Sequence, residues 1–334
     1  MALRQWYATG SHDMQIRSFV LGICIATWAA VVFGQAYPDK PVRLIVPQAA
    51  GSATDIFVRD FTPKWSVLLG QSIIVDNRPG AGAIIGTEAA AKAAPDGYTL
   101  LLGGSQTHAI NKSLYAKLSY DPIADFTPVA RLGALPMLLV VNAAVPAKTI
   151  PELVAYAKAN NRNINYASSG NGSTAHLAGA LFNSEAGINA QHVPYKAVAQ
   201  GLTDLLSGQI TMMFYPFNAV QQHIQAGKLN VLGVATETRP SYLPQVPTFA
   251  ESGYPSMVLS PWLAIYAPAG TPRRIVDILY STLERTMKDP DVTRRFLATG
   301  TDLYLAGPDE FARFTASEIG RYRKIVELSG AKAD

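Results

Sequence analysis

Short apolar runs alternate with amphipathic stretches along most of the chain, a pattern typical of strands and helices that follow one another in an α/β fold. The first three apolar runs cover residues 42–46, 73–75 and 98–102. Each run is followed by a loop rich in glycine and small polar residues, and then by a stretch with helical character. These residues predict three βα units on a mostly parallel sheet flanked by helices.

A second series of strands and helices begins near residue 136. Its first helix is indicated by Thr149 as the N-cap and by Pro151 in the first turn. The remaining strands are predicted over residues 136–141, 165–167, 192–195, 210–214, 231–235 and 262–267, and two helices over 271–288 and 308–328 complete the chain.

The order of these elements predicts two lobes, because the second series is inserted between the first series and a C-terminal return. The expected boundaries are 37–141 and 264–334 for lobe I and 142–263 for lobe II, with crossings near 140–144 and 259–264. Two crossings form a hinge, and a ligand in the cleft between the lobes can hold such a hinge closed. A single large α/β domain without hinge motion is the alternative.

An apolar run over residues 19–33, preceded by Arg17 and followed by small residues, is typical of a cleaved signal peptide. We expect a signal peptide over residues 1–36, with Met14 as an alternative start, and a mature chain exported to the periplasm. An N-terminal membrane anchor is the competing interpretation. The one cysteine, Cys24, lies inside this segment. The mature chain would therefore have no thiol, which suits an oxidising compartment.

The composition excludes several classes of protein. Of the 334 residues, 49% are hydrophobic and 16% are charged, which supplies apolar material for substantial cores and argues against disorder. The net charge is +4 and the basic residues are scattered, so we expect no nucleic-acid partner. A single cysteine and histidines without metal-ligand spacing predict neither a disulfide framework nor a metal site.

Four loops that follow predicted strands carry most of the candidate binding residues: 48–54, 103–107, 168–174 and 215–218. In an open α/β sheet, ligands bind outside the carboxyl ends of the strands, where helix N-termini offer free backbone N–H groups that favour anions. Ordinary helix N-capping uses the same residue types and is the alternative for each loop. The candidates in these loops are Gln48, Gly51, Ser52, Thr54, Ser105, Ser168, Ser169, Gly170, Ser173, Thr174, Phe217 and Asn218.

Three further candidates lie beside these loops. The four histidines beyond the signal segment are either structural or at the surface, and His176 is the one among them that could reach the cleft. Tyr195 ends a strand, where it can present its hydroxyl. Asp204 is either a cleft residue or part of a solvated helix face. Asp55 falls in a first helical turn, where a carboxylate complements the helix dipole. The aromatic residues of 214–217 form either an aromatic wall of the cleft or the edge of a core.

Catalytic signatures are missing from the sequence. No Gly-x-Ser-x-Gly elbow, His-Glu-x-x-His motif or Walker pattern occurs. Residues 170–175 fit Gly-x-Gly-x-x-Ala between a strand and a helix, but the position in mid-chain of an exported protein makes this a weak signal for a dinucleotide. We therefore expect no catalytic residue and no cofactor, and a receptor rather than an enzyme.

Several segments carry a resemblance to a known family: VRLIVPQAAGSATD, VDNRPGAGAIIGTEAAAKAAPDGYTLLLG, SSGNGSTAHLAG, HVPYK and LTDLLSGQITMMF. In this order, and over nearly the whole mature chain, they resemble the Bug-type periplasmic substrate-binding proteins of tripartite tricarboxylate transporters. The resemblance implies a two-lobed periplasmic-binding-protein fold, or Venus flytrap, that binds a small carboxylate and delivers it to membrane permease subunits. It also implies that loops 48–54 and 168–174 hold the carboxylate through backbone amides, hydroxyls and ordered waters.

The sequence departs from the pattern of that family in two segments. Gln48, Ala50 and Ser52 stand where the family usually has Phe, Pro and Gly, and Ala83 and Ile84 replace Gly and Asn. The amide at position 48 supplies a donor and an acceptor in place of an apolar ring. The resemblance implies a di- or tricarboxylate, or an aromatic carboxylate such as terephthalate, and these departures leave the choice open.

Two other functions stay open at the level of the sequence. A secreted hydrolase or lyase acting on a carboxylate would use Asp204, His176 and a loop serine. A ligand-sensing subunit would instead present its closed form to a membrane regulator. We expect a monomer, because the hinge needs both lobes free to move.

Overall fold

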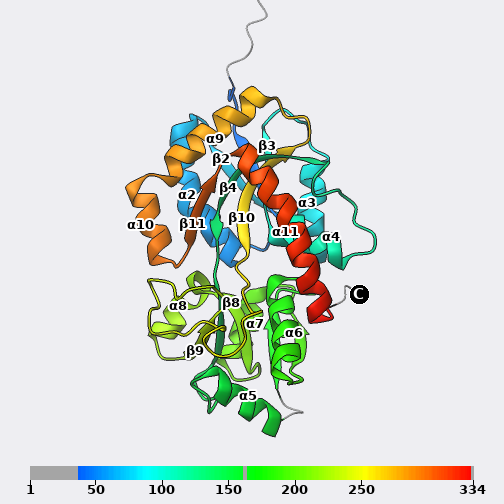
Figure 1. Ribbon diagram of the computed structural model, residues 1–334. Coiled ribbons are helices and arrows are strands. Elements are labelled where there is room, and N and C mark those ends of the chain that lie inside the picture. Colours follow the sequence, from blue (N-terminus) through cyan, green and yellow to red (C-terminus); the bar gives the residue numbers. More distant parts are fainter. Residues whose placement is uncertain (1–36, 161–163, 332–334) are drawn as a thin grey trace, which may run out of the picture. The chain divides into compact units, whose positions relative to one another are not determined.

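Two β-sheets organise the chain, of which a computed structural model describes residues 37–160 and 164–331 (Figure 1). Both sheets lie within the unit Lys40–Asp334. The expected signal peptide over residues 1–36, together with its start and its cysteine, lies outside the described residues.

The first sheet has six strands in the order β11-β4-β10-β3-β1-β2. β1 pairs in parallel with β2 and β3, whereas β10 runs antiparallel to β3 and β4, and β11 runs antiparallel to β4. A strand with neighbours on both sides and helices on its faces suits a continuous apolar run such as VRLIV in β1. The strands are β1 (Val42–Val46), β2 (Ile73–Asn77), β3 (Thr99–Gly104), β4 (Phe126–Ala134), β10 (Trp262–Pro268) and β11 (Asp302–Ala306).

The second sheet has five strands in the order β7-β6-β8-β5-β9. β6 pairs in parallel with β7 and β8, and β5 runs antiparallel to β8 and β9. The strands are β5 (Met137–Asn142), β6 (Asn165–Ser168), β7 (Gln191–Pro194), β8 (Met212–Pro216) and β9 (Leu229–Val234).

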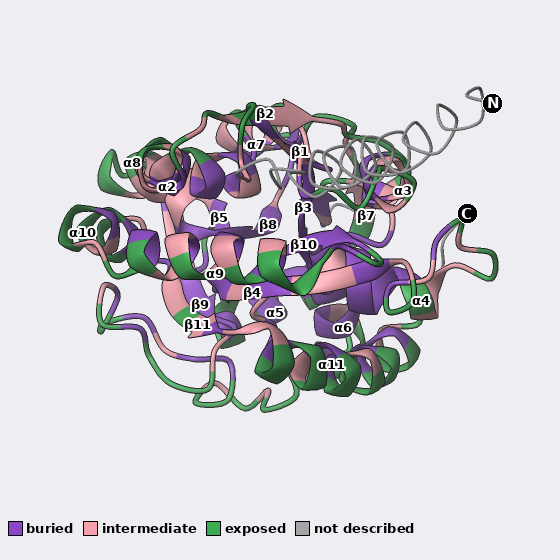
Figure 2. Cartoon of the chain, turned by 90° about the horizontal axis from the view of Figure 1, so that it is seen from above, coloured by how far each residue is buried: buried purple, intermediate pink, exposed green. Residues whose placement is uncertain are grey.

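Helices cover the sheets, and Figure 2 shows that they turn their exposed residues outward while the strands are mostly buried. Among the described residues, no helix combines the length and the apolar character that a membrane span requires. The helices, with two short turns, are α2 (Ala53–Leu69), η1 (Ala81–Ala83), α3 (Ile84–Ala91), η2 (Gln106–Ile110), α4 (Asn111–Leu114), α5 (Ile150–Ala159), α6 (Thr174–Ala186), α7 (Val198–Leu206), α8 (Phe217–Gln225), α9 (Arg273–Met287), α10 (Pro290–Ala298) and α11 (Pro308–Ser329).

The predicted two-lobed α/β class is confirmed, but two details of the prediction are wrong. The sheets are mixed rather than mostly parallel, because the strands that return from a crossing run against their neighbours. In addition, β5 pairs with β8 and β9 of the second sheet, although the sequence placed it at the end of lobe I. The chain therefore passes between the sheets at 135–136 and not near 140–144. The return crossing ends at Trp262, inside the expected range 259–264.

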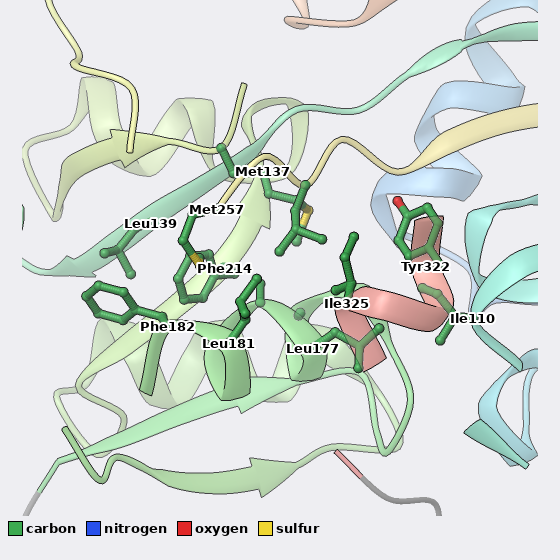
Figure 3. Close-up of a cluster of buried hydrophobic side chains, with 14 of the residues drawn as sticks. Ile110, Met137, Leu139, Leu177, Leu181, Phe182, Phe214, Met257, Tyr322 and Ile325 are labelled. Atoms are coloured by element: carbon green, nitrogen blue, oxygen red, sulfur yellow. The ribbon is translucent and has the colours of Figure 1, made fainter. Parts of the chain in front are cut away.

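The C-terminal helix α11 connects the two lobes a third time. It packs against β4 of the first sheet and against α6, which flanks the second sheet. In Figure 3, Tyr322 and Ile325 of α11 lie in the same buried cluster as Leu177 of α6 and Met137 of β5. The hinge expected from two crossings thus has a helix across it that is packed at both ends.

Candidate functional site

A cavity of about 660 Å³ lies between the two sheets. Its walls include the segments that follow β1, β2 and β3 of the first sheet, those that follow β6 and β7 of the second, and the last two residues of β8. These are the carboxyl ends of the parallel strands, where α/β folds bind their ligands.

Of the residues expected at the site, some line the cavity and others do not. The residues that line it are Gln48, Ser52, Thr54, Ser105, Ser169, Gly170, Thr174 and Tyr195. The residues that do not line it instead shape the loops, join the lobes or orient a lining residue; they are Gly51, Ser168, Ser173, His176, Asp204, Phe217 and Asn218.

The loop between β1 and α2 is held by the buried carboxylate of Asp55. Its Oδ2 accepts hydrogen bonds from the backbone N–H of Gly51 and from Nε of Arg59, both at 2.9 Å. Its Oδ1 accepts from Nδ2 of Asn77 at 3.0 Å. Ser52 caps α2, because its Oγ accepts from the backbone N–H of Asp55 at 3.3 Å. The start of α2 is thereby fixed at the wall of the cavity.

The charge of Asp55 is stabilised by the same contacts. Burial raises the pKa of Asp55, but the hydrogen bonds from Arg59, Gly51 and Asn77 outweigh burial, and the pKa lies below its ordinary value of 3.8. Asn77 also donates from Nδ2 to the backbone oxygen of Gln48 at 3.1 Å. One ionised side chain and its partners therefore hold the whole loop from Gln48 to the first turn of α2.

The loop between β6 and α6 is built in the same way with an imidazole in place of the carboxylate. The backbone N–H of Gly172 donates to Nδ1 of His176 at 3.0 Å, and Oγ of Ser173 accepts from the backbone N–H of His176 at 3.2 Å. The ring of His176 stacks on His192 with centroids 4.0 Å apart. The expectation that His176 reaches the cleft is therefore wrong, because the ring lies under the loop and supports it.

Ser168 belongs to the same support. It is fully buried, and its Oγ accepts from the backbone N–H of Gly170 at 3.1 Å and lies 2.6 Å from Nε2 of His192. Ser168 and Ser173 therefore position the backbone of the loop, while Ser169, Gly170 and Thr174 face the cavity.

Asp204 orients a cavity residue and does not line the cavity itself. Its Oδ2 accepts from the hydroxyl of Tyr195 at 2.6 Å, and its Oδ1 accepts from Nε2 of Gln200 at 2.9 Å. Burial and the neighbouring carboxylate raise the pKa of Tyr195 to about 12. Asp204 is thus bonded to Tyr195 and His176 to Gly172, and neither of the two residues named by the hydrolase alternative lines the cavity.

The sequence left two alternatives for the aromatic residues of 214–217, a wall of the cleft or the edge of a core. Phe214 is fully buried and packs against Phe182 and Phe249. Phe217 packs on Tyr242 with ring centroids 5.1 Å apart and does not line the cavity. Of these aromatic residues, Tyr215 alone lines the cavity, so the core-edge alternative is the correct one for the other two.

Asn218 joins the two lobes. Its Nδ2 donates to the backbone oxygen of Ala53 at 3.1 Å, so that the start of α8 is tied to the start of α2. Burial raises the pKa of Tyr215, and a hydrogen bond with the backbone of Ala53 partly offsets that effect. The backbone of Ala53, the first residue of α2, therefore has two partners in the other lobe, Asn218 and Tyr215.

One segment of the wall, residues 79–83, contains none of the binding residues expected from the sequence. It lines the cavity, and two of its non-glycine residues have a positive φ: Ala81 at 46° and Ala83 at 72°. This conformation costs a residue with a Cβ about 1–2 kcal/mol. Ala83 stands where the resembling family usually has Gly. That departure was visible in the sequence and marks a strained part of the cavity wall.

The two crossings between the sheets supply a second part of the wall that sequence reasoning missed. We call it the crossing wall. Both crossings are apolar in the sequence, which was the one signal for this part of the wall. That signal was not enough, because the places of these residues depend on how β4, β5 and β10 pair. The crossing wall consists of Leu135, Met137, Pro261, Trp262 and Leu263.

Charge is sparse around the cavity. Among the described residues that line it, Lys196 is the one charged side chain, and it is exposed on the loop between β7 and α7. No aspartate or glutamate is among them. Within the same described residues, no group of three His, Cys, Asp or Glu side chains is placed to hold a metal ion.

Known proteins resemble this chain over most of its length. The family model described as tripartite tricarboxylate transporter family receptor matches residues 58–330. BugT from Bordetella pertussis (strain Tohama I) is 38% identical over 316 residues, which is 94% of this chain and 97% of BugT. The structure of R. palustris Rpa4515 with adipate matches with a TM-score of 0.85 at 33% identity, over 89% of this chain and 99% of that one. MatC from Rhodopseudomonas palustris with bound malate matches with a TM-score of 0.82 at 32% identity, over 87% and 100%.

Proposed function

The chain belongs to the tripartite tricarboxylate transporter receptor family, and on this premise we propose that it is a solute receptor that binds a small carboxylate in the cavity between its two sheets. Members of the family are periplasmic binding proteins. Two structures similar to this chain hold carboxylates, adipate in one and malate in the other.

One observation carries the proposal: two serine-capped helices, one from each lobe, begin at the cavity, and no acidic side chain among the described residues lines it. Ser52 caps α2 and Ser173 caps α6, and residues of the first turn of each helix line the cavity. The N-terminus of a helix carries a partial positive charge and unpaired N–H groups, which favour a bound anion. A carboxylate placed between them would be held by both lobes at once.

The neutral donors around the cavity complete this environment. Thr54, Ser105 and Ser169 can donate hydroxyl protons to carboxylate oxygens. Gln48 adds a side-chain amide. The exposed Lys196 can contribute a charge at the edge of the site. None of these groups is a buried unpaired cation, which would be costly to hold without a counter-ion.

The finer parts of the proposal rest on membership of the family. We infer export to the periplasm through the N-terminal segment 1–36, delivery of the ligand to membrane permease subunits, and a monomeric receptor without catalytic turnover. The contact between Asn218 and Ala53 supports the transport role, because it couples the start of α2 to the opposite lobe. A bound anion at α2 would therefore favour the closed arrangement that a permease recognises.

Isothermal titration calorimetry of the purified mature chain against a panel of carboxylates tests the proposal. The panel contains succinate, adipate, malate, citrate, benzoate, terephthalate and hexanoate, with the matching alcohols and amides as controls. At least one acid should bind with a 1:1 stoichiometry and a Kd in the micromolar range or below, equivalent to about −8 kcal/mol. Binding by an alcohol or amide as tight as by its acid, or no binding at all, would contradict the proposal.

A further inference from the structure

Two aromatic rings of the second lobe lie against the backbone of the first lobe, outside the cavity. Phe217, at the start of α8, and Tyr242, between β9 and β10, pack on each other beside the apolar cluster of the second sheet. Gly300 lies between α10 and β11 of the first sheet. A Cβ atom placed on Gly300 would lie 2.6 Å from Cδ1 of Phe217 and 2.8 Å from Cε2 of Tyr242. We call these three residues the interlobe contact, and none of them lines the cavity.

The space beside Gly300 is filled, whereas the space beside a comparable glycine is open. Gly300 follows α10 with a left-handed backbone at φ 68°, a conformation that by itself favours glycine. Gly187, which ends α6, has nearly the same φ of 60°, but a Cβ there would meet no atom within 4 Å. The backbone therefore accounts for glycine at both positions, and the two rings are an additional reason at position 300.

Buried oxygen atoms beside the interlobe contact have no hydrogen-bond partner within the described residues. They are Oδ1 of Asn218, the hydroxyl oxygen of Tyr242 and Oγ1 of Thr301. Asn218 itself bridges the lobes, because its Nδ2 donates to the backbone oxygen of Ala53 at 3.1 Å. Burial of an oxygen without a partner is unfavourable, so these atoms oppose the apolar packing of the rings. Opposing contributions of this kind suit a contact that forms and separates.

On the premise of the proposed function, we propose that the interlobe contact forms when the lobes close and sets the affinity for the carboxylate without touching it. A carboxylate between the starts of α2 and α6 is held by both lobes only in the closed arrangement. The measured affinity is the affinity of the closed arrangement multiplied by the fraction of molecules that adopt it. Packing of Phe217 and Tyr242 on Gly300 raises that fraction, so it strengthens the binding of every acid by the same factor.

Residues that line the cavity differ from the interlobe contact in this respect. Thr54, Ser105 and Ser169 can meet particular groups of a ligand, so a substitution there changes the affinities for different acids unequally. A common factor for acids of different length and shape is therefore the signature of a residue that acts on closure alone.

Gly300→Ala tests the proposal by calorimetry with adipate, malate and the other acids of the panel. The new methyl group would overlap both rings in the closed arrangement, and it is free of them when the lobes are apart. We expect every acid that binds the unmodified protein to lose about tenfold in affinity, with factors that agree to within about twofold. Unchanged affinity in the folded variant, or factors that differ widely from acid to acid, would overturn the proposal.

Gly187→Ala is the matched control for this variant. It also adds a methyl group to a left-handed backbone, but at a place where the methyl group meets no other atom. It should therefore bind each acid as the unmodified protein does. An equal loss of affinity in both variants would mean that backbone strain, and not the interlobe contact, is responsible, and would overturn the proposal.

Phe217→Ala gives an independent reading from the opposite lobe. Loss of the ring should weaken the binding of every acid by one common factor of about threefold, because the closed arrangement loses an apolar contact. In the Phe217→Ala background, Gly300→Ala should cost less than about threefold, since the nearer of the two rings is gone. Thermal melts confirm that each variant is folded, and Phe217→Ala alone still tests the proposal where Gly300→Ala does not fold. Unchanged affinity in folded Phe217→Ala would contradict the proposal.

The outcomes separate this inference from the proposed function. If an acid binds and its affinity does not respond to the interlobe contact, the carboxylate receptor stands and only this inference is refuted. If none of the acids binds while the protein is folded, the carboxylate receptor is refuted and the inference with it.

Discussion

The loops before α2 and α6 have the same backbone and the same serine cap, but different side chains hold them in place. In both loops a glycine precedes the capping serine, with φ 76° at Gly51 and 75° at Gly172. The N–H of each glycine donates to the side chain four residues later. That side chain is the carboxylate of Asp55 in one lobe and the imidazole of His176 in the other.

The comparison indicates that the loop needs a side-chain acceptor for the glycine N–H, and that this acceptor can be a carboxylate or an imidazole. Asp55 brings a negative charge to the start of α2, where it also pairs with Arg59 and Asn77. In the other lobe, Nδ1 of His176 accepts from the corresponding N–H, that of Gly172, and the ring packs on His192. The two helix starts at the cavity are consequently unequal as anion sites, because a carboxylate lies beneath one and an imidazole beneath the other.

The largest effect is expected from Asp55→Ala. The substitution removes the acceptor of three hydrogen bonds and leaves the N–H of Gly51 and the amide of Asn77 without it. We expect a loss of about 2–4 kcal/mol in the free energy of unfolding, measured by urea denaturation. Arg59→Ala is the control, and it should cost less than about 1 kcal/mol because the arginine side chain is 54% exposed. Equal losses would mean that the ion pair, and not the loop contact, accounts for the role of Asp55.

A smaller loss is expected from His176→Ala. The N–H of Gly172 loses its acceptor and His192 loses a stacked neighbour, for about 1–2 kcal/mol. His176→Asn provides an acceptor at the reach that Asp55 uses in the other loop, so it should recover about half of that loss. If the asparagine variant is no more stable than the alanine variant, the contact with Gly172 is not what His176 contributes, and the likeness of the two loops is superficial.

The smallest effect is a difference in pH dependence. The folded state lowers the pKa of Asp55, so its contribution to stability is present above the unfolded value near 3.8 and is lost as the pH falls through the folded value. Relative to the unmodified protein, Asp55→Asn should be uniformly less stable between pH 5 and 7 and should lose stability less steeply below pH 4. Urea denaturation across this range measures both curves, and parallel curves would show that Asp55 does not titrate differently on folding.

The sequence predicted local elements well and long-range pairing less well. The strand Val42–Val46 was found with its true ends, because a continuous apolar run between polar residues is a local signal. The helix start at Thr149 was found for the same reason, since its side chain caps the N–H of Glu152. β4 was missed because Pro128, Arg131 and Gly133 interrupt its apolar pattern, and only the pairing with β10 and β11 makes it a strand.

For the site, loops could be predicted but side-chain directions could not. The alternation of strand, polar loop and helix placed Ser52 and Ser169 at the carboxyl ends of strands, which is where the cavity lies. Whether His176 points into the cavity or under the loop depends on the ring of His192, which arrives from a different strand. The crossing wall depends on which sheet β5 joins, and nothing local in its apolar run decides that.

If the two lobes rotate about their crossings, the helix α11 limits which side of the cleft can open. Its C-terminal half packs on α6, whereas the link between Asn218 and Ala53 lies near the start of α8, on the opposite side in Figure 1. A rotation that keeps α11 packed at both ends moves the two lobes least at α6 and most at α8. Solute would accordingly enter and leave past Asn218. The start of α6 would move little, and the start of α2 would approach it as the lobes close.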